Sequence, residues 1–370
     1  MGRSRALLAS AMGWALILLA GCAAPALVPY STEGVPLALV PATLGGITDA
    51  RGPFRARFCQ AAGVADSPAD CERLLPRLSG EGSAAPGPDP AETRLRRVLF
   101  VPGLWSDCVR RLTATEKLLD EAFAKAGWRF AVVNVDGTSS SEGNAGRLRD
   151  AVLDDPGEPG DTVLIGHSKG VVDILVALEA HSEMHARVAA VVAMAGAVGG
   201  SPLAAKAPRA LITAVRNTPG LTCQKGDGRA LESLDPQTRR DWLARHPLPE
   251  GIRFYSLVAY PAPERISRGL ATSHGLLSRI DARNDGQLLA HDQVIPGSTL
   301  LGYVNADHWA IATEVSEALH GIPRRIANHN DFPRGALLRA ILAQVVADME
   351  QAALSDTRPS SARPGAATTH

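Results

Sequence analysis

The chain has 370 residues, equal numbers of basic and acidic residues, and an apolar content of 45%. This length suits one large α/β domain or two small domains, and the apolar content is ample for a buried core. The neutral charge balance, without a basic stripe, argues against nucleic-acid binding, and an aromatic content of 4% argues against a stacking platform for bases or sugars.

Residues 1–22 are predicted to be a lipoprotein signal peptide. Two arginines precede an apolar run, residues 6–20, that is short for a membrane-spanning helix. The sequence Leu-Ala-Gly-Cys at 19–22 resembles the lipobox of bacterial lipoproteins. This resemblance implies cleavage before Cys22, lipid on that cysteine and stable anchoring by several acyl chains. Ala23, where aspartate would favour the inner membrane, implies the outer membrane and a protein that faces the periplasm. An ordinary cleaved signal or a single anchor helix is the alternative.

Residues 23–94 are predicted to be a tether and a lead-in to the main domain. The first twelve read as the tether, and residues 35–75 carry apolar patches that fit either early strands or a helical lead-in. Residues 79–94 are rich in Gly, Pro, Ser and Ala, which is typical of a loop.

Strand-like and helix-like segments then alternate over residues 95–354. Strands are predicted at 97–101, 130–135, 162–165, 188–194, 252–260 and 300–304, and helices at 111–126, 144–154, 171–178, 263–280 and 334–352. This alternation predicts a parallel sheet with helices on both faces and reactive loops at the carboxyl ends of its strands. Residues 203–249 contain only short helical runs, and we interpret them as a cap over the active site. Residues 355–370 are predicted to be a disordered tail.

The segment around Ser168 has the pattern of a nucleophile elbow. The strand 162–165 leads into Gly-His-Ser-Lys-Gly at 166–170, and a helical pattern follows. The glycines permit a turn in which a Cβ would clash, and the positive end of the helix points at any oxyanion formed there. The five-residue pattern is weak alone, so the flanking strand and helix favour this interpretation over an inert serine in a glycine turn. His167 is expected to point away from the site.

Two downstream residues complete a catalytic set. Asp285 lies in the turn-forming sequence Asn-Asp-Gly, and His308 lies in the loop after the strand 300–304. Serine needs a neutral imidazole to accept its proton, and the imidazole needs a carboxylate to fix its tautomer. We therefore predict Ser168 as nucleophile, His308 as base and Asp285 as acid. The alternative for His308 is a capping or surface histidine.

Three other aspartates compete with the predicted acid. Asp292 lies on a plausible loop and is the main rival, whereas Asp281 carries less weight. Asp307 is adjacent in sequence to His308 and would have difficulty reaching its ring Nδ1 atom. Asp285 could also be a turn aspartate that bonds only its own backbone.

The order Ser168, Asp285, His308, together with the strand–turn–helix at the serine, resembles the α/β-hydrolase fold and, in outline, the bacterial lipases and esterases. The Asn-Asp-Gly segment is similar to the one that holds the acid in many bacterial lipases. The resemblance covers about residues 95–350 and implies a mostly parallel sheet with a cap insertion.

The resemblance also implies an oxyanion hole. In this family, the loop after an early strand supplies one backbone amide and usually reads His-Gly-x, whereas this chain has Pro-Gly-Leu at 102–104. By position, the donors would be the N–H groups of Leu104 and Lys169. Trp105 would replace Leu104 if the loop is displaced by one residue, and a plain turn is the alternative.

Four cysteines besides Cys22 remain for the folded protein, and an even number in an oxidising compartment predicts two disulfides. We favour Cys59–Cys71, a short local pair, with Cys108–Cys223 tying a loop near the active site to the cap. The other pairings and buried free thiols remain open. Because Cys-x-x-Cys is missing from the sequence, no cysteine-based metal site is predicted.

These features predict a lipid-anchored serine hydrolase that cleaves carboxylic esters, lipids among them, through an acyl-enzyme and without metal or organic cofactor. Its partners would be the ester substrate and, through the lipid, the membrane. An acyltransferase or a peptidase would use the same three residues. An alternative of another class is a binding lipoprotein of the envelope that keeps the fold without catalysis. Acyl length and oligomeric state do not follow from the sequence.

Overall fold

The computed structural model describes residues 46–82, 97–109, 123, 127–154, 157–208, 210–217, 223–224, 226–313, 325–329 and 331–356. Several predictions concern residues outside these ranges, and they remain predictions. They are the signal peptide with Cys22, the tether, most of the loop 79–94, the helix 111–126 apart from Phe123, and nearly all of the C-terminal tail.

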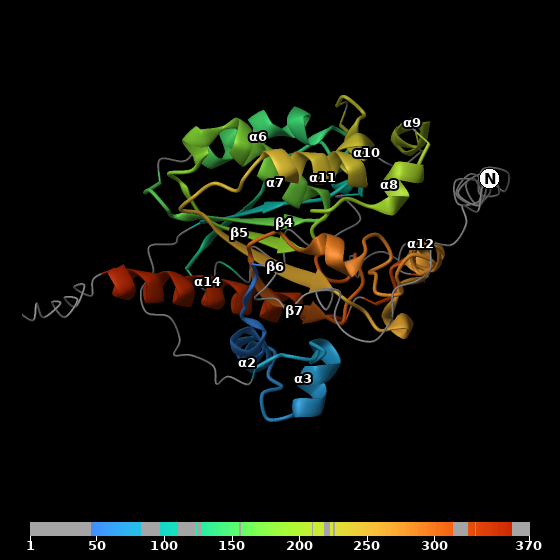
Figure 1. Cartoon of the computed structure of the whole chain (residues 1–370). Coiled ribbons are helices and arrows are strands. Elements are labelled where there is room, and N and C mark those ends of the chain that lie inside the picture. Colours follow the sequence, from blue (N-terminus) through green and yellow to red (C-terminus); the bar gives the residue numbers. More distant parts are fainter. Residues whose placement is uncertain are drawn as a thin grey trace, which may run out of the picture.

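Seven parallel strands form one sheet in the order β1-β7-β6-β5-β4-β2-β3 (Figure 1). The strands are β1 (Thr48–Asp49), β2 (Arg97–Val101), β3 (Arg129–Val132), β4 (Thr162–His167), β5 (Val188–Met194), β6 (Arg253–Ala259) and β7 (Thr299–Val304). The central strands β4 and β5 are buried along their whole length, as expected of a parallel sheet that helices cover on both faces. The predicted fold class is confirmed.

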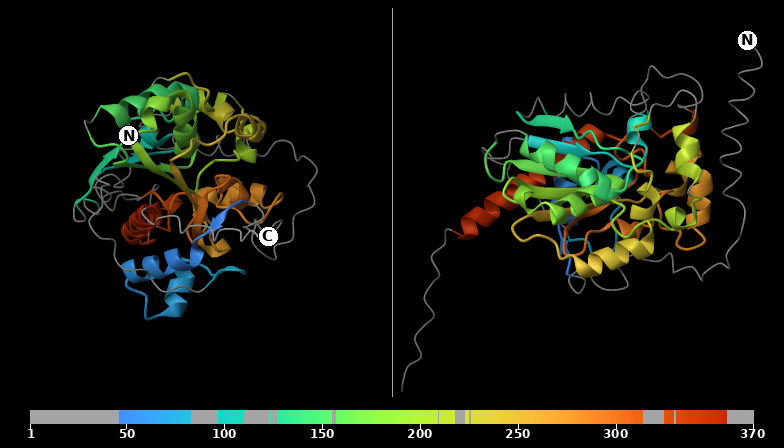
Figure 2. Two further views of the ribbon diagram at one scale, coloured as in Figure 1. Left: turned by 60° about the vertical axis from the view of Figure 1, so that its left-hand side comes forward. Right: turned by 90° about the horizontal axis from the view of Figure 1, so that it is seen from above.

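Helices cover both faces of the sheet because side chains alternate along each strand. In β4, Val163 and Ile165 enter one core and Leu164 enters the other. The first core is closed by α2 (Arg51–Ala61) and α14 (Arg334–Asp356), and the second by α6 (Ser141–Leu153) and α7 (Lys169–Ala180). Figure 2 shows the green helices α6 and α7 on one side and the blue α2 and red α14 on the other.

The segment before β2 contains both kinds of element that its apolar patches allowed. Strand β1 pairs with β7 at the edge of the sheet, and α2 and α3 (Pro68–Leu74) follow. The disulfide Cys59–Cys71 joins these two helices. The second disulfide, Cys108–Cys223, joins α4 (Ser106–Val109) to the predicted cap. The structure therefore confirms the favoured pairing.

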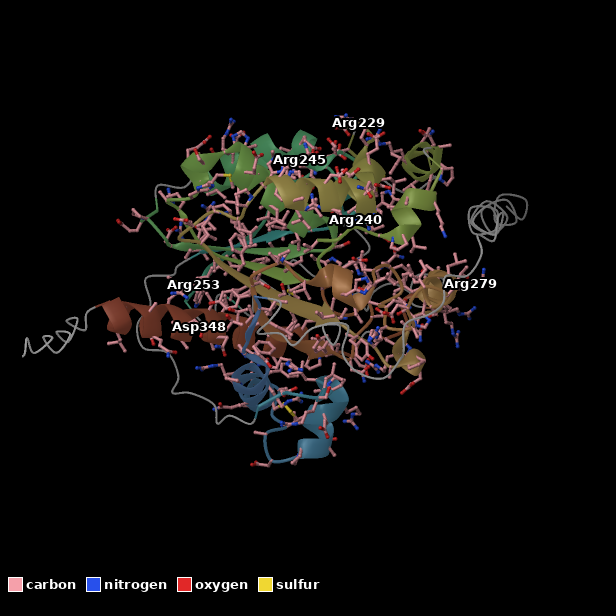
Figure 3. All side chains as sticks on the ribbon, in the orientation of Figure 1. Arg229, Arg240, Arg245, Arg253, Arg279 and Asp348 are labelled. Atoms are coloured by element: carbon pink, nitrogen blue, oxygen red, sulfur yellow. A yellow bond between two sulfur atoms is a disulfide. The ribbon has the colours of Figure 1, made fainter. Side chains whose placement is uncertain are left out.

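Residues 203–249, called the cap segment below, contain short helices and no strand among their described residues. They include most of α8 (Pro202–Lys206) and all of α9 (Ala210–Arg216), α10 (Ala230–Ser233) and α11 (Pro236–Arg245). Figure 1 shows α8 and α9, with α12 (Ala271–Leu277), beyond the arrowheads of the strands, where the carboxyl ends lie. Figure 3 labels Arg229, Arg240 and Arg245, which are exposed on the outer side of this segment.

Some elements differ from the predicted bounds for local reasons. Helix α6 begins three residues earlier than predicted because the hydroxyl of Ser140 caps it, accepting a hydrogen bond from Gly143 N at 3.1 Å. The predicted helix 263–280 is broken into the 3-10 turns η5 (Pro263–Arg265) and η6 (Arg268–Leu270) followed by α12. The described residues also form the 3-10 turns η4 (Ser182–Met184) and η7 (Ala290–Gln293). In the part of the chain that the structure describes, no helix is long and apolar enough to span a membrane.

Candidate active site

Ser168 lies in a sharp turn between β4 and α7. Its φ of 55° is in the left-handed region, which is strained for a residue with a side chain. The glycines of the motif make the turn possible. A Cβ on Gly166 would lie 2.8 Å from the backbone of Val171, and one on Gly170 would lie 2.0 Å from the carbonyl oxygen of Val101. The strand–turn–helix predicted at the serine is therefore present, with close backbone approach at both glycines.

The structure brings Ser168, His308 and Asp285 together in one chain of hydrogen bonds. His308 Nε2 lies 2.9 Å from Ser168 Oγ, and His308 Nδ1 lies 2.7 Å from Asp285 Oδ2. Because an ionised carboxylate only accepts, Nδ1 carries the proton of the neutral ring and Nε2 is left to accept from the serine hydroxyl. The serine is 7% exposed, the histidine 5% and the aspartate 0%. This geometry suits proton transfer from serine to imidazole.

The carboxylate of Asp285 is held by its own turn. Its Oδ1 atom accepts hydrogen bonds from the backbone N–H groups of Gln287 at 2.8 Å and Leu288 at 2.7 Å. Its backbone carbonyl accepts from His308 N at 3.1 Å. The turn and the histidine loop are therefore bound to each other through both main chain and side chain, which fixes the ring orientation.

The three competing aspartates have other partners. The Asp292 carboxylate lies 3.7 Å from Nε2 of the histidine that precedes it, and burial raises the pKa of this aspartate. Asp281 forms an ion pair of 2.7 Å with Arg283. Asp307 accepts hydrogen bonds from three backbone N–H groups of its surroundings. Among the described contacts, none of these carboxylates is hydrogen-bonded to the ring of His308.

The predicted oxyanion loop, residues 102–105, passes directly over the nucleophile. A Cβ on Gly103 would lie 2.7 Å from Cβ of Ser168 and 3.2 Å from its hydroxyl oxygen. Trp105 N donates to the carbonyl oxygen of Gly137 at 3.1 Å, so this amide is already engaged. The amides of Leu104 and of Lys169, the first residue of α7, have no acceptor among the described atoms. The geometry therefore favours Leu104 over Trp105.

Solved structures identify the family. No family model and no curated protein sequence matches the chain. The crystal structure of the metagenomic carboxyl esterase MGS0156 is 35% identical, with a TM-score of 0.77, and the match covers 87% of this chain and 97% of that chain. The chain belongs to the carboxyl esterases of the α/β-hydrolase fold.

Two lipases of known structure are less similar to this chain. The Bacillus licheniformis lipase BlEst2 in its mature form is 22% identical, with a TM-score of 0.46, over 62% of this chain and 89% of that one. The Staphylococcus hyicus lipase is 12% identical, with a TM-score of 0.49, over 74% of this chain and all of that one.

His167 of the esterase makes contacts with His308 that the sequence did not indicate. Its ring packs against the ring of His308, with centroids 4.9 Å apart. Its Nε2 atom donates to the carbonyl oxygen of His308 at 2.8 Å. Burial, together with His308, lowers the pKa of His167 to about 3, so the ring is neutral at ordinary pH. His167 was expected to point away from the site, and its ring instead lies against His308 because the loop after β7 folds over the end of β4.

Two further buried polar groups of the esterase support the site and were missed from the sequence. Gln293 donates from Nε2 to Asp285 Oδ2 at 3.2 Å, and its Oε1 accepts from Ala259 N at 2.7 Å, which ties the acid to the end of β6. Lys169 forms a fully buried ion pair with Asp173 at 2.5 Å. The i, i+4 spacing of this pair on α7 is a signal that the sequence does contain.

Asp173 extends the buried ion pair into a network between the two helices of this face. Its Oδ1 accepts from the hydroxyl of Ser141 at 2.6 Å, and its Oδ2 accepts from the Asn144 side chain at 2.8 Å. The first turn of α7, which carries the predicted oxyanion donor, is thereby bound to α6. Across the described part of the esterase, no three His, Cys, Asp or Glu side chains gather closely enough to hold a metal ion.

Proposed function

We propose that the esterase hydrolyses carboxylic esters through a serine acyl-enzyme, with Ser168 as nucleophile, His308 as general base and Asp285 as the orienting acid. The observation that carries this proposal is the continuous, buried chain of hydrogen bonds from the serine hydroxyl through the imidazole to the carboxylate, at 2.9 and 2.7 Å. The likeness to a carboxyl esterase at 35% identity supports the class of substrate.

In the first half of the reaction, Ser168 Oγ attacks the ester carbonyl carbon while its proton passes to His308 Nε2. The carbonyl oxygen takes the electron pair and becomes an oxyanion. Leu104 N–H and Lys169 N–H donate to it, and the amino-terminal end of α7 adds a favourable dipole. As the intermediate collapses, the bond to the alcohol oxygen breaks and His308 protonates the leaving alkoxide.

In the second half, water replaces the alcohol. His308 accepts a proton from the water, the resulting hydroxide attacks the acyl-enzyme carbonyl, and the acid product leaves as Ser168 regains its proton from the imidazole. Asp285 stays ionised throughout and stabilises the imidazolium in both halves. Its two oxygens are held by backbone and side-chain donors, which keeps the carboxylate in position beside the ring.

The test of this proposal is labelling of the serine with a fluorophosphonate, which phosphonylates an activated serine and releases fluoride. The full chain and its Ser168→Ala variant are labelled side by side and assayed on p-nitrophenyl butyrate and on the matching anilide. We expect labelling of the wild type alone, a loss of esterase activity of about 10⁴-fold or more in the variant, and little cleavage of the anilide. Full hydrolysis by Ser168→Ala would show that the nucleophile is misassigned. Faster cleavage of the anilide would favour a peptidase.

We also propose that lipid on Cys22 anchors the esterase to the outer membrane, facing the periplasm. The support is the basic, apolar and lipobox pattern of residues 1–22. Two disulfides in the fold are consistent with an oxidising compartment. The test is growth of cells that express the full chain with a labelled fatty acid. The label should appear on the wild type and be lost in Cys22→Ala, and an unlabelled wild type would contradict the proposal.

A further inference from the structure

The carboxylate of Asp107 connects three parts of the molecule. It lies in α4, directly after the oxyanion loop. Its Oδ1 atom accepts from Gly137 N at 3.1 Å, and its Oδ2 atom accepts from Gln224 N, in the cap segment, at 2.6 Å. The next residue, Cys108, forms the disulfide with Cys223, which precedes Gln224. One carboxylate and one covalent bond at adjacent positions thus hold the oxyanion loop to the same point of the cap segment.

The oxyanion loop depends on contacts from outside to keep its shape. Trp105 has a φ of 59°, a conformation that side chains rarely adopt. Gly137 packs against it so closely that a Cβ there would lie 2.5 Å from Asp107 Oδ1 and 2.7 Å from Trp105 N. Hydrogen bonds run in both directions, from Trp105 N to the Gly137 carbonyl and from Gly137 N to Asp107. Gly137 therefore holds the strained loop in place through these hydrogen bonds and close contacts.

The cap segment is itself fixed to the loop that follows Gly137. Asp227 accepts hydrogen bonds from Ser140 N at 2.8 Å and from the Ser140 hydroxyl at 2.6 Å, and its own N–H donates to the Ser139 hydroxyl at 3.1 Å. Arg216 donates to the hydroxyl of Thr138 and, at 3.0 Å, to the carbonyl of Gly226. Residues 226–229 are therefore fixed close along the chain to Gln224, whose backbone N–H binds Asp107.

We propose that Asp107 and the Cys108–Cys223 disulfide act together as a latch through which the cap segment positions the backbone amide of Leu104 for catalysis. Asp107 is a positioning residue, since it acts on the oxyanion through the loop and not by contact with substrate. This inference rests on the proposed function, in which Leu104 N–H stabilises the oxyanion. Because that stabilisation develops in the transition state, losing the latch should lower kcat and leave KM nearly unchanged.

The chain contains a matched control for the disulfide. Cys59–Cys71 joins α2 to α3, which Figure 1 shows on the opposite side of the sheet from the cap segment. Removing either disulfide replaces two cysteines by serines and removes one covalent crosslink. Only Cys108–Cys223 adjoins the oxyanion loop, so only its loss should change the rate of each active molecule.

The experiment compares Asp107→Asn, the double variant Cys108→Ser/Cys223→Ser, the combination of all three substitutions and the control Cys59→Ser/Cys71→Ser, all in the full chain. Asparagine has the size of aspartate, but its side-chain NH₂ group is a donor. This group would face one of the two backbone N–H groups from which the Asp107 carboxylate accepts. The kinetics of p-nitrophenyl butyrate hydrolysis are measured per active site, counted by the endpoint of fluorophosphonate labelling. This count separates the rate of folded molecules from their yield.

We expect kcat to fall about 10- to 100-fold in Asp107→Asn and in the Cys108/Cys223 variant, with KM within about twofold. The kcat of the triple variant should be no lower than that of the slower of these two variants, because both changes act on the oxyanion loop. The control should keep its kcat. An unchanged kcat in Asp107→Asn, an equal loss in the control, or multiplying effects in the triple variant would overturn the latch. Asp107→Asn decides the matter even if the disulfide variant fails to fold. Full hydrolysis by Ser168→Ala would instead contradict the proposed function.

Discussion

His167 and His308 pack ring against ring beside the nucleophile: their ring centroids lie 4.9 Å apart with the planes tilted by 40°, and His167 Nε2 donates to the His308 carbonyl oxygen at 2.8 Å. One histidine precedes the serine in sequence and the other accepts its proton in the proposed mechanism. The contact requires His167 to be neutral, since a second positive charge beside the imidazolium would oppose proton transfer.

This contact predicts a pH-dependent stability. The pKa of His167 is about 3 in the folded protein, against 6.5 for an exposed histidine. Below pH 6.5 the unfolded chain binds this proton and the folded chain does not, so acidification favours unfolding until about pH 3. Between pH 7 and pH 5, His167 should reduce the unfolding free energy by about 2 kcal/mol. Urea unfolding of wild type and His167→Leu at both pH values measures the difference, and equal losses in the two proteins would contradict it.

The acid can be identified by a pair of conservative substitutions. Asp285→Asn should lower kcat by about 10⁴-fold, because the amide no longer fixes the tautomer of His308 or stabilises its charged form. Asp292→Asn should remain within about twofold of wild type, since its carboxylate has no hydrogen bond to that ring. Steady-state kinetics on p-nitrophenyl butyrate measure both. Loss of activity in Asp292→Asn alone would reverse the assignment.

In the buried pair Lys169–Asp173, substitution of the lysine should destabilise the protein. A second substitution at the aspartate should restore part of the stability. Lys169→Met should lower the free energy of unfolding by about 3–5 kcal/mol, because it leaves the Asp173 carboxylate buried without its cation. Adding Asp173→Asn should restore part of this loss, since the charge is removed while one acceptor for Ser141 or Asn144 remains. Urea unfolding of the two variants measures the effect. A double variant less stable than Lys169→Met would contradict the explanation.

Gly103 should be intolerant of any side chain. Gly103→Ala places a methyl group 2.7 Å from Ser168 Cβ, so the oxyanion loop must move, and kcat should fall by about 100-fold or more. Gly146→Ala, on α6, is the matched control because a Cβ there meets no atom within 4 Å. The control should keep full activity and gain roughly 0.5–1 kcal/mol of stability from helix propensity. Kinetics together with thermal unfolding distinguish the two glycines.

The sequence by itself determined the features that depend on short stretches of chain. Apolar runs and helical spacing identified every strand of the sheet except β1, together with the helices α6, α7 and α14, because the strands and these helices bury continuous or periodic apolar patterns. The Gly-x-Ser-x-Gly turn was readable because its glycines stand at fixed positions beside the serine, between an apolar strand and a helical pattern. The cysteine pairs were a preference among three connectivities that the sequence left open.

Tertiary structure alone decided which distant groups meet at the carboxyl edge of the sheet. Asp285 and Asp292 are both plausible acids in sequence, and only the path of the loop between η6 and β7 places one of them against His308. The same holds for the contact of Gln293 with Ala259 and for that of Asp107 with Gln224, which join segments distant in sequence. A parallel sheet brings the ends of non-adjacent strands together in space. The contacts made there depend on the packing of whole loops, which no local pattern of residues records.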